Sequence, residues 1–251
     1  MSGHSKWATI KRKKGKADAE RGRIFTKLIK EITVSARDGG GDPNGNPRLR
    51  TAITAAKAAN MPADNIDRAI KKGTGELPGV HYEESIYEGY GPGGVALFIE
   101  VLTDNRNRTT SEIRHILTRN NGRLGEAGSV AWMFDQKGLI VVERAGADED
   151  TLIMLALEAG ADDVKEVGDT FEIVTPPAKF EAVRNALGKA GVHAASAELA
   201  RIPQTTVSLV RRETEQVMRL LDLIEEHDDV QKVSSNLEIP DEILNEISAG
   251  H

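Results

Sequence analysis

The sequence predicts an α+β protein of several domains, with an N-terminal helical domain and two α/β ferredoxin-like domains, one inserted in the other. The length of 251 residues suits two or three domains of modest size. Apolar residues recur at helical spacing up to about residue 73, and strand-like runs alternate with helical runs after it. Within this alternating part, residues 137–202 contain a complete βαββαβ pattern, which is typical of the ferredoxin-like fold.

Residues 1–78 are expected to form the helical domain. The first helix, over 18–38, has apolar residues at spacings of three and four: Ile24, Phe25, Leu28, Ile29 and Ile32. Asn46 is placed to cap a second helix with Pro47 at its first position, and a third helix runs from Pro62 to Gly73. The apolar faces are rich in alanine, so we expect a thin core of marginal stability.

Residues 79–136 and 203–251 are expected to form one discontinuous α/β domain. Its first part contains a hairpin over 81–90 and 95–102, a helix over 109–121 and a strand over 129–134. Its second part contains a strand over 205–210, a helix around Val217–Ile224, a strand over 230–236 and a short helical tail from Pro240.

Residues 137–202 are expected to form the inserted βαββαβ domain. The predicted elements are strands over 139–143, 164–167, 170–174 and 192–199, and helices over 148–159 and 177–190. Gly168-Asp169 supplies the turn of the central hairpin.

Composition excludes several classes of function. The chain has no cysteine, which removes disulfides, thiol catalysis and Cys-based metal sites and fits a cytoplasmic protein. It contains no long apolar run and no secretory signal, so we expect no membrane partner. The net charge of −6 is unevenly distributed: residues 1–80 carry +9 and residues 81–251 carry −15. That polarity predicts that the N-terminal end meets a polyanion.

Two patterns that resemble enzyme sites are given other interpretations. Gly89-x-Gly91-x-x-Gly94 matches a dinucleotide-binding pattern, but a strand rather than a helix follows it, so we predict a hairpin turn. The six histidines have no zinc-hydrolase spacing, and the acidic run 225–229 is interpreted as a solvated face. We therefore expect no catalytic residue, metal, cofactor or small-molecule substrate.

The strongest binding signal is the basic arm at residues 6–16, which has six cations and Trp7 in eleven residues. Its cations are suited to phosphates and Trp7 to an unpaired base, although packing of Trp7 under the helical domain is slightly favoured. The alternative is a solvated arm.

A second signal is the segment 105–123, which has five arginines and one glutamate in an otherwise acidic half. Arg106 and Arg108 are predicted to lie in the loop before a helix, where arginine and helix-end amides bind anions. The alternative is pairing with nearby carboxylates. The glycine-rich run 122–129 either brings backbone close to a ligand or turns a helix into a strand, and the turn is slightly favoured.

Several unusual motifs of the chain resemble those of the YebC/PmpR family. They are Ser2–Trp7, Lys13–Phe25, Gly41–Pro47, Asn60–Pro62, Tyr87–Gly94, Thr103–Thr109 and Gly128–Phe134. The resemblance implies three domains and a non-enzymatic, cytoplasmic protein. It further implies a transcriptional regulator that binds DNA or, as in related organellar members, a translation factor, with a proposed role at the ribosome.

Together these observations predict a regulatory protein that binds nucleic acid, with DNA as the first choice and ribosomal RNA as the alternative. The absence of a helix-turn-helix signature mildly favours RNA. A nucleotide-using hydrolase or transferase and a purely structural module remain rival classes. The residues expected to contact nucleic acid are Lys6, Trp7, Lys11, Arg12, Lys13, Lys14, Lys16, Arg21, Arg23, Arg106, Arg108, Arg114, Arg119 and Arg123.

Overall fold

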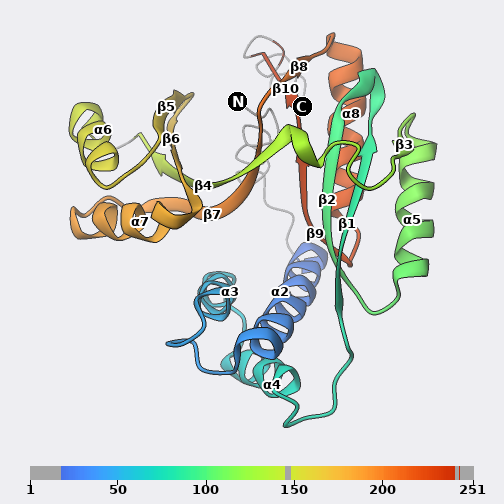
Figure 1. Cartoon of the computed structure of the whole chain (residues 1–251), viewed down its shortest axis with the longest axis horizontal. Helices are drawn as coiled ribbons and strands as arrows, with labels where there is room; N and C mark the ends of the chain where they lie inside the picture. Colours follow the sequence, from blue (N-terminus) through green and yellow to red (C-terminus); the bar gives the residue numbers. More distant parts are fainter. Residues whose placement is uncertain (1–17, 145–147, 241–242, 244–251) are drawn as a thin grey trace. The chain divides into compact units, whose positions relative to one another are not determined.

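The computed structural model describes residues 18–144, 148–240 and 243 (Figure 1). Contacts divide the chain into two compact units. Among the described residues, one comprises 18–131 and 209–235, and the other comprises 132–144, 148–208, 236–240 and 243. The helical domain therefore groups with the first sheet. The predicted boundaries of three domains stay a prediction, and each unit is described by itself below.

Three helices form the N-terminal part, as predicted: α2 (Asp18–Gly39), α3 (Pro47–Ala58) and α4 (Ala63–Gly73). The predicted cap is confirmed, because Asn46 Oδ1 accepts a hydrogen bond from the Leu49 amide at 3.1 Å. The buried core cluster contains four alanines together with larger aliphatic side chains such as Ile32 and Leu49. The α-carbon of Gly73 lies so close to α2 that a Cβ there would be 2.3 Å from the Thr33 carbonyl oxygen. Helices α2 and α4 therefore pack closely against each other at Gly73.

The first sheet has the strand order β3-β1-β2-β9 and is antiparallel throughout. Its strands are β1 (Glu83–Tyr90), β2 (Ala96–Thr103), β3 (Arg123–Leu124) and β9 (Val230–Ser235). Helix α5 (Arg106–Arg119) packs on β1 and β3, and helix α8 (Arg211–Glu225) packs on β9. Contacts between the two helices place them on the same face of the sheet (Figure 1).

The glycine loop between β1 and β2 is a hairpin turn, as predicted. Pro92–Gly94 forms a single 3-10 turn, η1, and the Gly91 amide donates to the Val95 carbonyl at 2.8 Å. Strand β2 follows directly. The loop does not open a helix, so it lacks the context that the dinucleotide-binding pattern requires.

The second sheet, in the other unit, has the order β5-β6-β4-β7, which is the ferredoxin-like arrangement. Its elements are β4 (Phe134–Glu143), α6 (Glu149–Glu158), β5 (Asp163–Val167), β6 (Thr170–Thr175), η3 (Pro177–Lys179), α7 (Phe180–Lys189) and β7 (Ala194–Pro203). The core between this sheet and its helices includes Ile140, Leu152, Phe171 and Val183. The predicted βαββαβ order is confirmed.

One predicted strand and one helix start are wrong, and another predicted strand is shorter than expected. The predicted strand 129–134 is a bend followed by the 3-10 turn η2 (Ala131–Met133), because the amides of Val130 and Ala131 donate to the Glu88 carboxylate instead of to a neighbouring strand. The predicted strand 205–210 shortens to β8 (Val207–Ser208), which pairs in parallel with β10 (Leu237–Glu238). Helix α5 begins at Arg106 rather than Thr109, since Asn105 caps it.

Within the part of the chain that the structure describes, no helix is both long and apolar enough to cross a bilayer. The predicted tail beyond Pro240 lies outside the described residues apart from Ile243.

Candidate nucleic-acid interface

Helix α5 presents the arginine-rich segment. Asn105 Oδ1 accepts a hydrogen bond from the Arg108 amide at 3.1 Å and so fixes the first turn. Thr109, Ile113 and Leu117 are buried against the sheet. The remaining faces of α5 carry arginines into solvent, so Arg106 lies in a helical turn and not in the loop that the sequence predicted.

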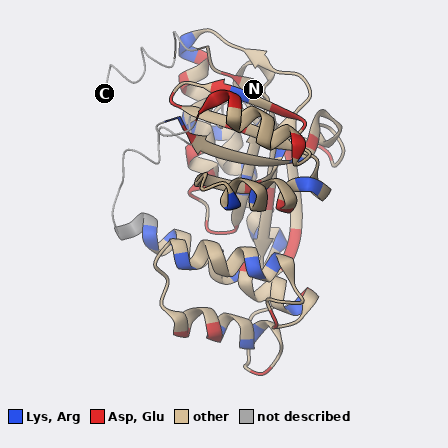
Figure 2. Ribbon diagram, turned by 90° about the vertical axis from the view of Figure 1, so that its left-hand side faces the viewer, with Lys and Arg blue, Asp and Glu red and all other residues tan. Residues whose placement is uncertain are grey.

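Besides Arg108, four predicted arginines of the segment 105–123 are exposed: Arg106, Arg114, Arg119 and Arg123. Among the described residues none of the four has a carboxylate within ion-pair distance. Some other cations are paired, for example Arg48 with Glu31. Basic and acidic residues are interspersed over much of the ribbon in Figure 2. The absence of a carboxylate partner among the described residues therefore separates these four arginines from Arg108, which has two such partners.

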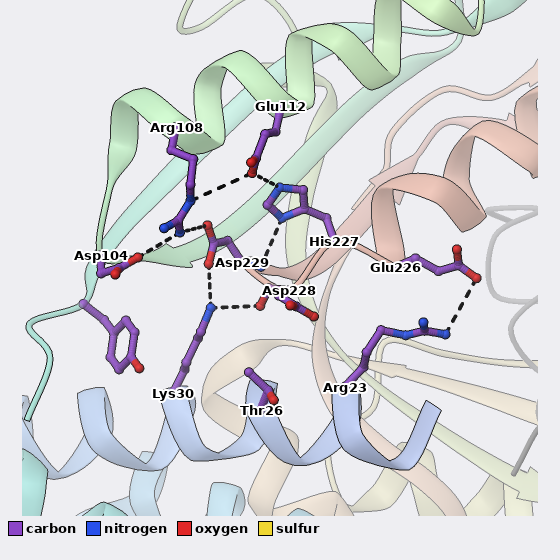
Figure 3. A pocket seen from close by; sticks show the side chains of 11 residues that line it. Arg23, Thr26, Lys30, Asp104, Arg108, Glu112, Glu226, His227, Asp228 and Asp229 are labelled. Atoms are coloured by element: carbon purple, nitrogen blue, oxygen red, sulfur yellow. Dashed lines mark hydrogen bonds and ion pairs between the residues drawn. The ribbon is translucent and has the colours of Figure 1, made fainter. Parts of the chain in front are cut away.

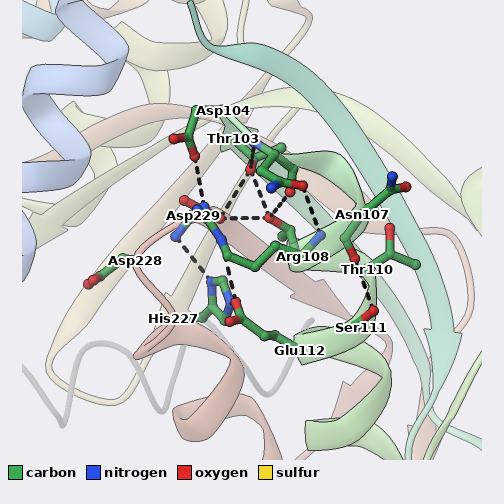
Figure 4. Close-up of polar contacts among 12 residues, drawn as sticks. Thr103, Asp104, Asn107, Arg108, Thr110, Ser111, Glu112, His227, Asp228 and Asp229 are labelled. Atoms are coloured by element: carbon green, nitrogen blue, oxygen red, sulfur yellow. Dashed lines mark hydrogen bonds and ion pairs between the residues drawn. The ribbon is translucent and has the colours of Figure 1, made fainter. Parts of the chain in front are cut away.

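Arg108 has a different environment from its neighbours on α5. Its Nη2 lies 2.8 Å from Asp104 Oδ1 and 2.7 Å from Asp229 Oδ2 (Figure 4). The hydrogen bonds to Asp229 and Asp104 favour the charged guanidinium more than burial disfavours it. They therefore raise the pKa of Arg108 above its ordinary value. Arg108 therefore pairs with carboxylates, which is the alternative interpretation given for this segment.

Asp229 is the centre of a buried ionic network, which we call the Asp229 joint: Asp229, Lys30, Arg108, Thr103 and Thr109. Lys30 Nζ lies 2.6 Å from Asp229 Oδ1, and both side chains are less than a tenth exposed. Thr109 Oγ1 and Thr103 Oγ1 donate to Asp229 Oδ2 at 2.6 and 3.1 Å. The joint fastens helix α2 to the first sheet (Figure 3).

The ionisation of Asp229 follows from these contacts. Burial opposes the charged carboxylate, but hydrogen bonds from Lys30, Thr109 and Arg108 together outweigh burial and hold the pKa of Asp229 well below its ordinary value. The interpretation of 225–229 as a solvated face is therefore wrong at Asp229. The partners are Lys30 and Arg108, which are 199 and 121 residues away in sequence, so no local pattern could have identified them.

Glu112, His227 and Asp229 offer ligand atoms within 4.8 Å of one another, a spacing that a metal ion can bridge. Their donor atoms are already used, since His227 Nε2 lies 2.8 Å from Glu112 Oε2 and His227 Nδ1 accepts from the Asp229 amide at 3.1 Å. Two cations, Lys30 and Arg108, also neutralise Asp229. A metal would have to displace both, so this cluster serves the joint.

A hollow of about 820 Å³ opens beside the joint, between α2 and the turn from α8 to β9 (Figure 3). Arg23 lines it, with Nη2 3.8 Å from Glu226 Oε1, and Arg108 lines it from the other side. The lining carries three strong cations and five carboxylates, so its charge is mixed. Arg21, on the same helix, is exposed. The remaining predicted residues, Lys6, Trp7, Lys11, Arg12, Lys13, Lys14 and Lys16, lie outside the described residues.

The glycine-rich run 122–129 is fixed by an internal anion that sequence reasoning missed. The Glu88 carboxylate accepts hydrogen bonds from the amides of Gly128, Val130 and Ala131 at 2.6–2.7 Å. Burial opposes the charge on Glu88, but the three amides outweigh it and lower its pKa. Those three amides are therefore not available to a ligand.

The fold and the arginine-rich segment belong to an α+β chain whose family is identified by comparison with known proteins. Residues 5–76 match the family model of the TACO1/YebC protein N-terminal domain, and residues 82–237 match that of the TACO1/YebC second and third domain. The chain belongs to the TACO1/YebC family, as its motifs predicted.

Relatives and a solved structure agree with this assignment. A probable transcriptional regulatory protein of Pelotomaculum thermopropionicum is 63% identical over 243 residues, covering 96% of this chain and all of that one. Another from Desulfatibacillum aliphaticivorans is 60% identical over 246 residues, with 98% and 100% covered. The crystal structure of the conserved hypothetical protein Aq1575 from Aquifex aeolicus has a TM-score of 0.82 and 49% identity, and covers 90% of this chain and 93% of that chain. The predicted fold class is confirmed as an α+β protein with an N-terminal helical part and two antiparallel sheets, of which the second has the ferredoxin-like order.

Proposed function

We propose that this protein is a cytoplasmic, non-enzymatic transcriptional regulator that binds DNA through unpaired arginines and a basic arm. The observation that carries the proposal is the set of exposed arginines without carboxylate partners at Arg106, Arg114, Arg119 and Arg123. Guanidinium groups left unpaired on a protein of net charge −6 are available for phosphate oxygens. The names of the relatives support regulation of transcription.

The other predicted contacts take supporting roles in this proposal. Lys6, Lys11–Lys14 and Lys16 supply further cations, Trp7 supplies a ring for an unpaired base, and Arg21 adds a cation on α2. Arg108 and Arg23 hold carboxylates of the chain itself, so we assign them first to fastening α2 and only secondarily to nucleic acid.

The test compares salt dependence between charge-matched variants. The triple variant Arg106→Gln, Arg114→Gln, Arg119→Gln should reduce the slope of log K against log salt by about 2–3 on a DNA duplex, because each neutralised phosphate adds ~0.9 to that slope. The control, Lys137→Gln, Arg144→Gln, Arg184→Gln, removes the same charge from the unit of the second sheet, where each cation has a carboxylate partner. It should leave the slope unchanged.

The same titration with a ribosomal RNA fragment separates the two targets. A slope that changes on the duplex supports the transcriptional proposal. A slope that changes on RNA alone favours a translation factor. Equal effects of the arginine variant and its control on both ligands would remove α5 from the interface.

A further inference from the structure

Arg123 and Tyr90 form a cation–π pair at the edge of the first sheet. The two residues are directly opposite each other in the antiparallel pairing of β3 with β1, so their side chains project from the same face. The guanidinium carbon of Arg123 lies over the Tyr90 ring, 4.7 Å from its centroid. Arg123 is exposed, and among the described residues this ring is its only recorded side-chain partner.

Both the backbone and the side-chain hydroxyl group of Tyr90 are held in place. Its backbone lies in β1, which is paired with β2 on one side and β3 on the other. Its hydroxyl donates to the Ser129 carbonyl at 3.1 Å, and the loop around Ser129 is fastened to the Glu88 carboxylate through its amides. The ring is thus a fixed support beneath a guanidinium that faces solvent.

Glycines permit this arrangement. A Cβ at Gly89 would lie 2.7 Å from the Arg123 carbonyl oxygen, and a Cβ at Gly122 would lie 2.8 Å from the Tyr90 carbonyl oxygen. Any other residue at either position would push β3 away from β1 and separate Arg123 from the ring. Close backbone approach is the less favoured of the two interpretations of the glycine-rich run. At Gly122 the backbone does approach closely, but to the chain's own strand β1, and this approach positions Arg123.

We propose that the Arg123–Tyr90 pair is a stacking site for an unpaired nucleobase, which lies on the guanidinium face opposite the tyrosine ring. An arginine that meets only phosphate needs no aromatic support, whereas a guanidinium stacked on a ring presents a second flat face. Bases within a duplex are stacked on one another, so the site takes a base from a single strand, a bulge or an opened duplex. The inference rests on the proposed function and names the form of nucleic acid that this part of the interface takes.

The experiment uses the full chain and single-stranded 12-mers of ribose and deoxyribose type, each with a matched abasic 12-mer that has the same phosphates and no bases. Arg123→Lys keeps the charge and removes the planar group. It should weaken binding to base-containing 12-mers by about tenfold, the loss of one stacked base, and leave the abasic 12-mers unaffected. The control Arg119→Lys, on an exposed arginine for which no ring contact is recorded, should leave the ratio of the two affinities unchanged.

The outcomes distinguish failure of the stacking site from failure of the proposed function. Equal weakening on both 12-mers, or no weakening on either, overturns the stacking site and leaves the proposed function standing. Failure of the native chain to bind any 12-mer or duplex in a salt-dependent way overturns the proposed function and the stacking site together. A loss confined to ribose or to deoxyribose 12-mers supports the site and identifies the source of the base.

Discussion

At the scale of single residues, Asp229 has the largest structural consequence. It is 3% exposed and accepts hydrogen bonds from Lys30, Arg108 and Thr109. Asp229→Asn leaves Lys30 buried without a counter-charge, and we expect a loss of about 3–5 kcal/mol in the free energy of unfolding. Urea denaturation at pH 7 measures it. Asp228→Asn, at the exposed neighbour, should change stability little, and an equal loss there would contradict the assignment.

The same carboxylate predicts a pH dependence. Because the pKa of Asp229 is lowered in the folded state, its charged form adds stability that is complete above its ordinary value of about 3.9 and is lost as pH falls toward the folded-state pKa. The difference in stability between the native chain and Asp229→Asn should therefore shrink below about pH 4. Denaturation midpoints from pH 7 to 3 test this, and a difference that stays constant would contradict it.

Glu88 has a comparable role within one loop. Glu88→Gln presents an NH₂ group to at least one amide that now donates to a carboxylate oxygen, so we expect a loss of about 2 kcal/mol in unfolding free energy. Thermal melting compares this variant with Glu126→Gln, an exposed change in the same loop. If both variants melt at the same temperature as the native chain, the carboxylate does not stabilise the loop.

At the scale of elements, two arginines in the first turn of α5, Arg106 and Arg108, have different surroundings although the sequence assigns them the same role. The sequence predicts that Arg106 and Arg108 lie together in one anion-binding loop, but Arg108 contacts buried Asp229 and the Arg106 side chain has no such contact. Arg108→Ala should lower unfolding free energy by about 1–2 kcal/mol, less than a fully buried contact because the guanidinium is partly exposed. Arg106→Ala should leave stability unchanged and weaken nucleic-acid binding. Equal stabilities would contradict the division.

Periodicity and turn residues predicted most elements, because those signals are local. The βαββαβ order and the Asn46 cap needed only spacing and one turn or capping residue. The strand predicted over 129–134 was wrong because its amides bind Glu88, a residue 42 positions from Val130. The arginine cluster was likewise visible in the sequence, but which arginines are paired depends on Asp229, 121 residues from Arg108. Long-range pairing is what sequence patterns omit.

At the scale of the whole molecule, the basic arm gives a prediction about binding. Lys11, Arg12, Lys13 and Lys14 are consecutive cations, with few carboxylates near them in sequence. Replacing all four with Ala should reduce the slope of log K against log salt by about 3–4, because each cation is expected to neutralise one phosphate. Base preference should persist, since phosphate contacts position the protein without specifying sequence. Titrations on duplex DNA and ribosomal RNA measure both, and an unchanged slope would exclude the arm.

The predicted insertion gives a second test at this scale. Lys137 and Ala200 are paired across β4 and β7, so the ends of the segment 137–202 lie side by side. Replacing that segment with a short Gly/Ser bridge should leave the unit of the first sheet folded. Circular dichroism and a cooperative thermal transition check this outcome. A product without such a transition would contradict the predicted domain boundaries.

The pairing of distant segments also sets the order in which the chain can mature during synthesis. Strand β2 has β9 as its outer neighbour, and Lys30 has Asp229 as its partner 199 residues later. At ~5–20 residues per second, a ribosome needs about 10–40 s to add those residues. Until then, the nascent chain carries an open sheet edge and an unneutralised lysine, so its first half depends on shielding against aggregation while its second half is being made.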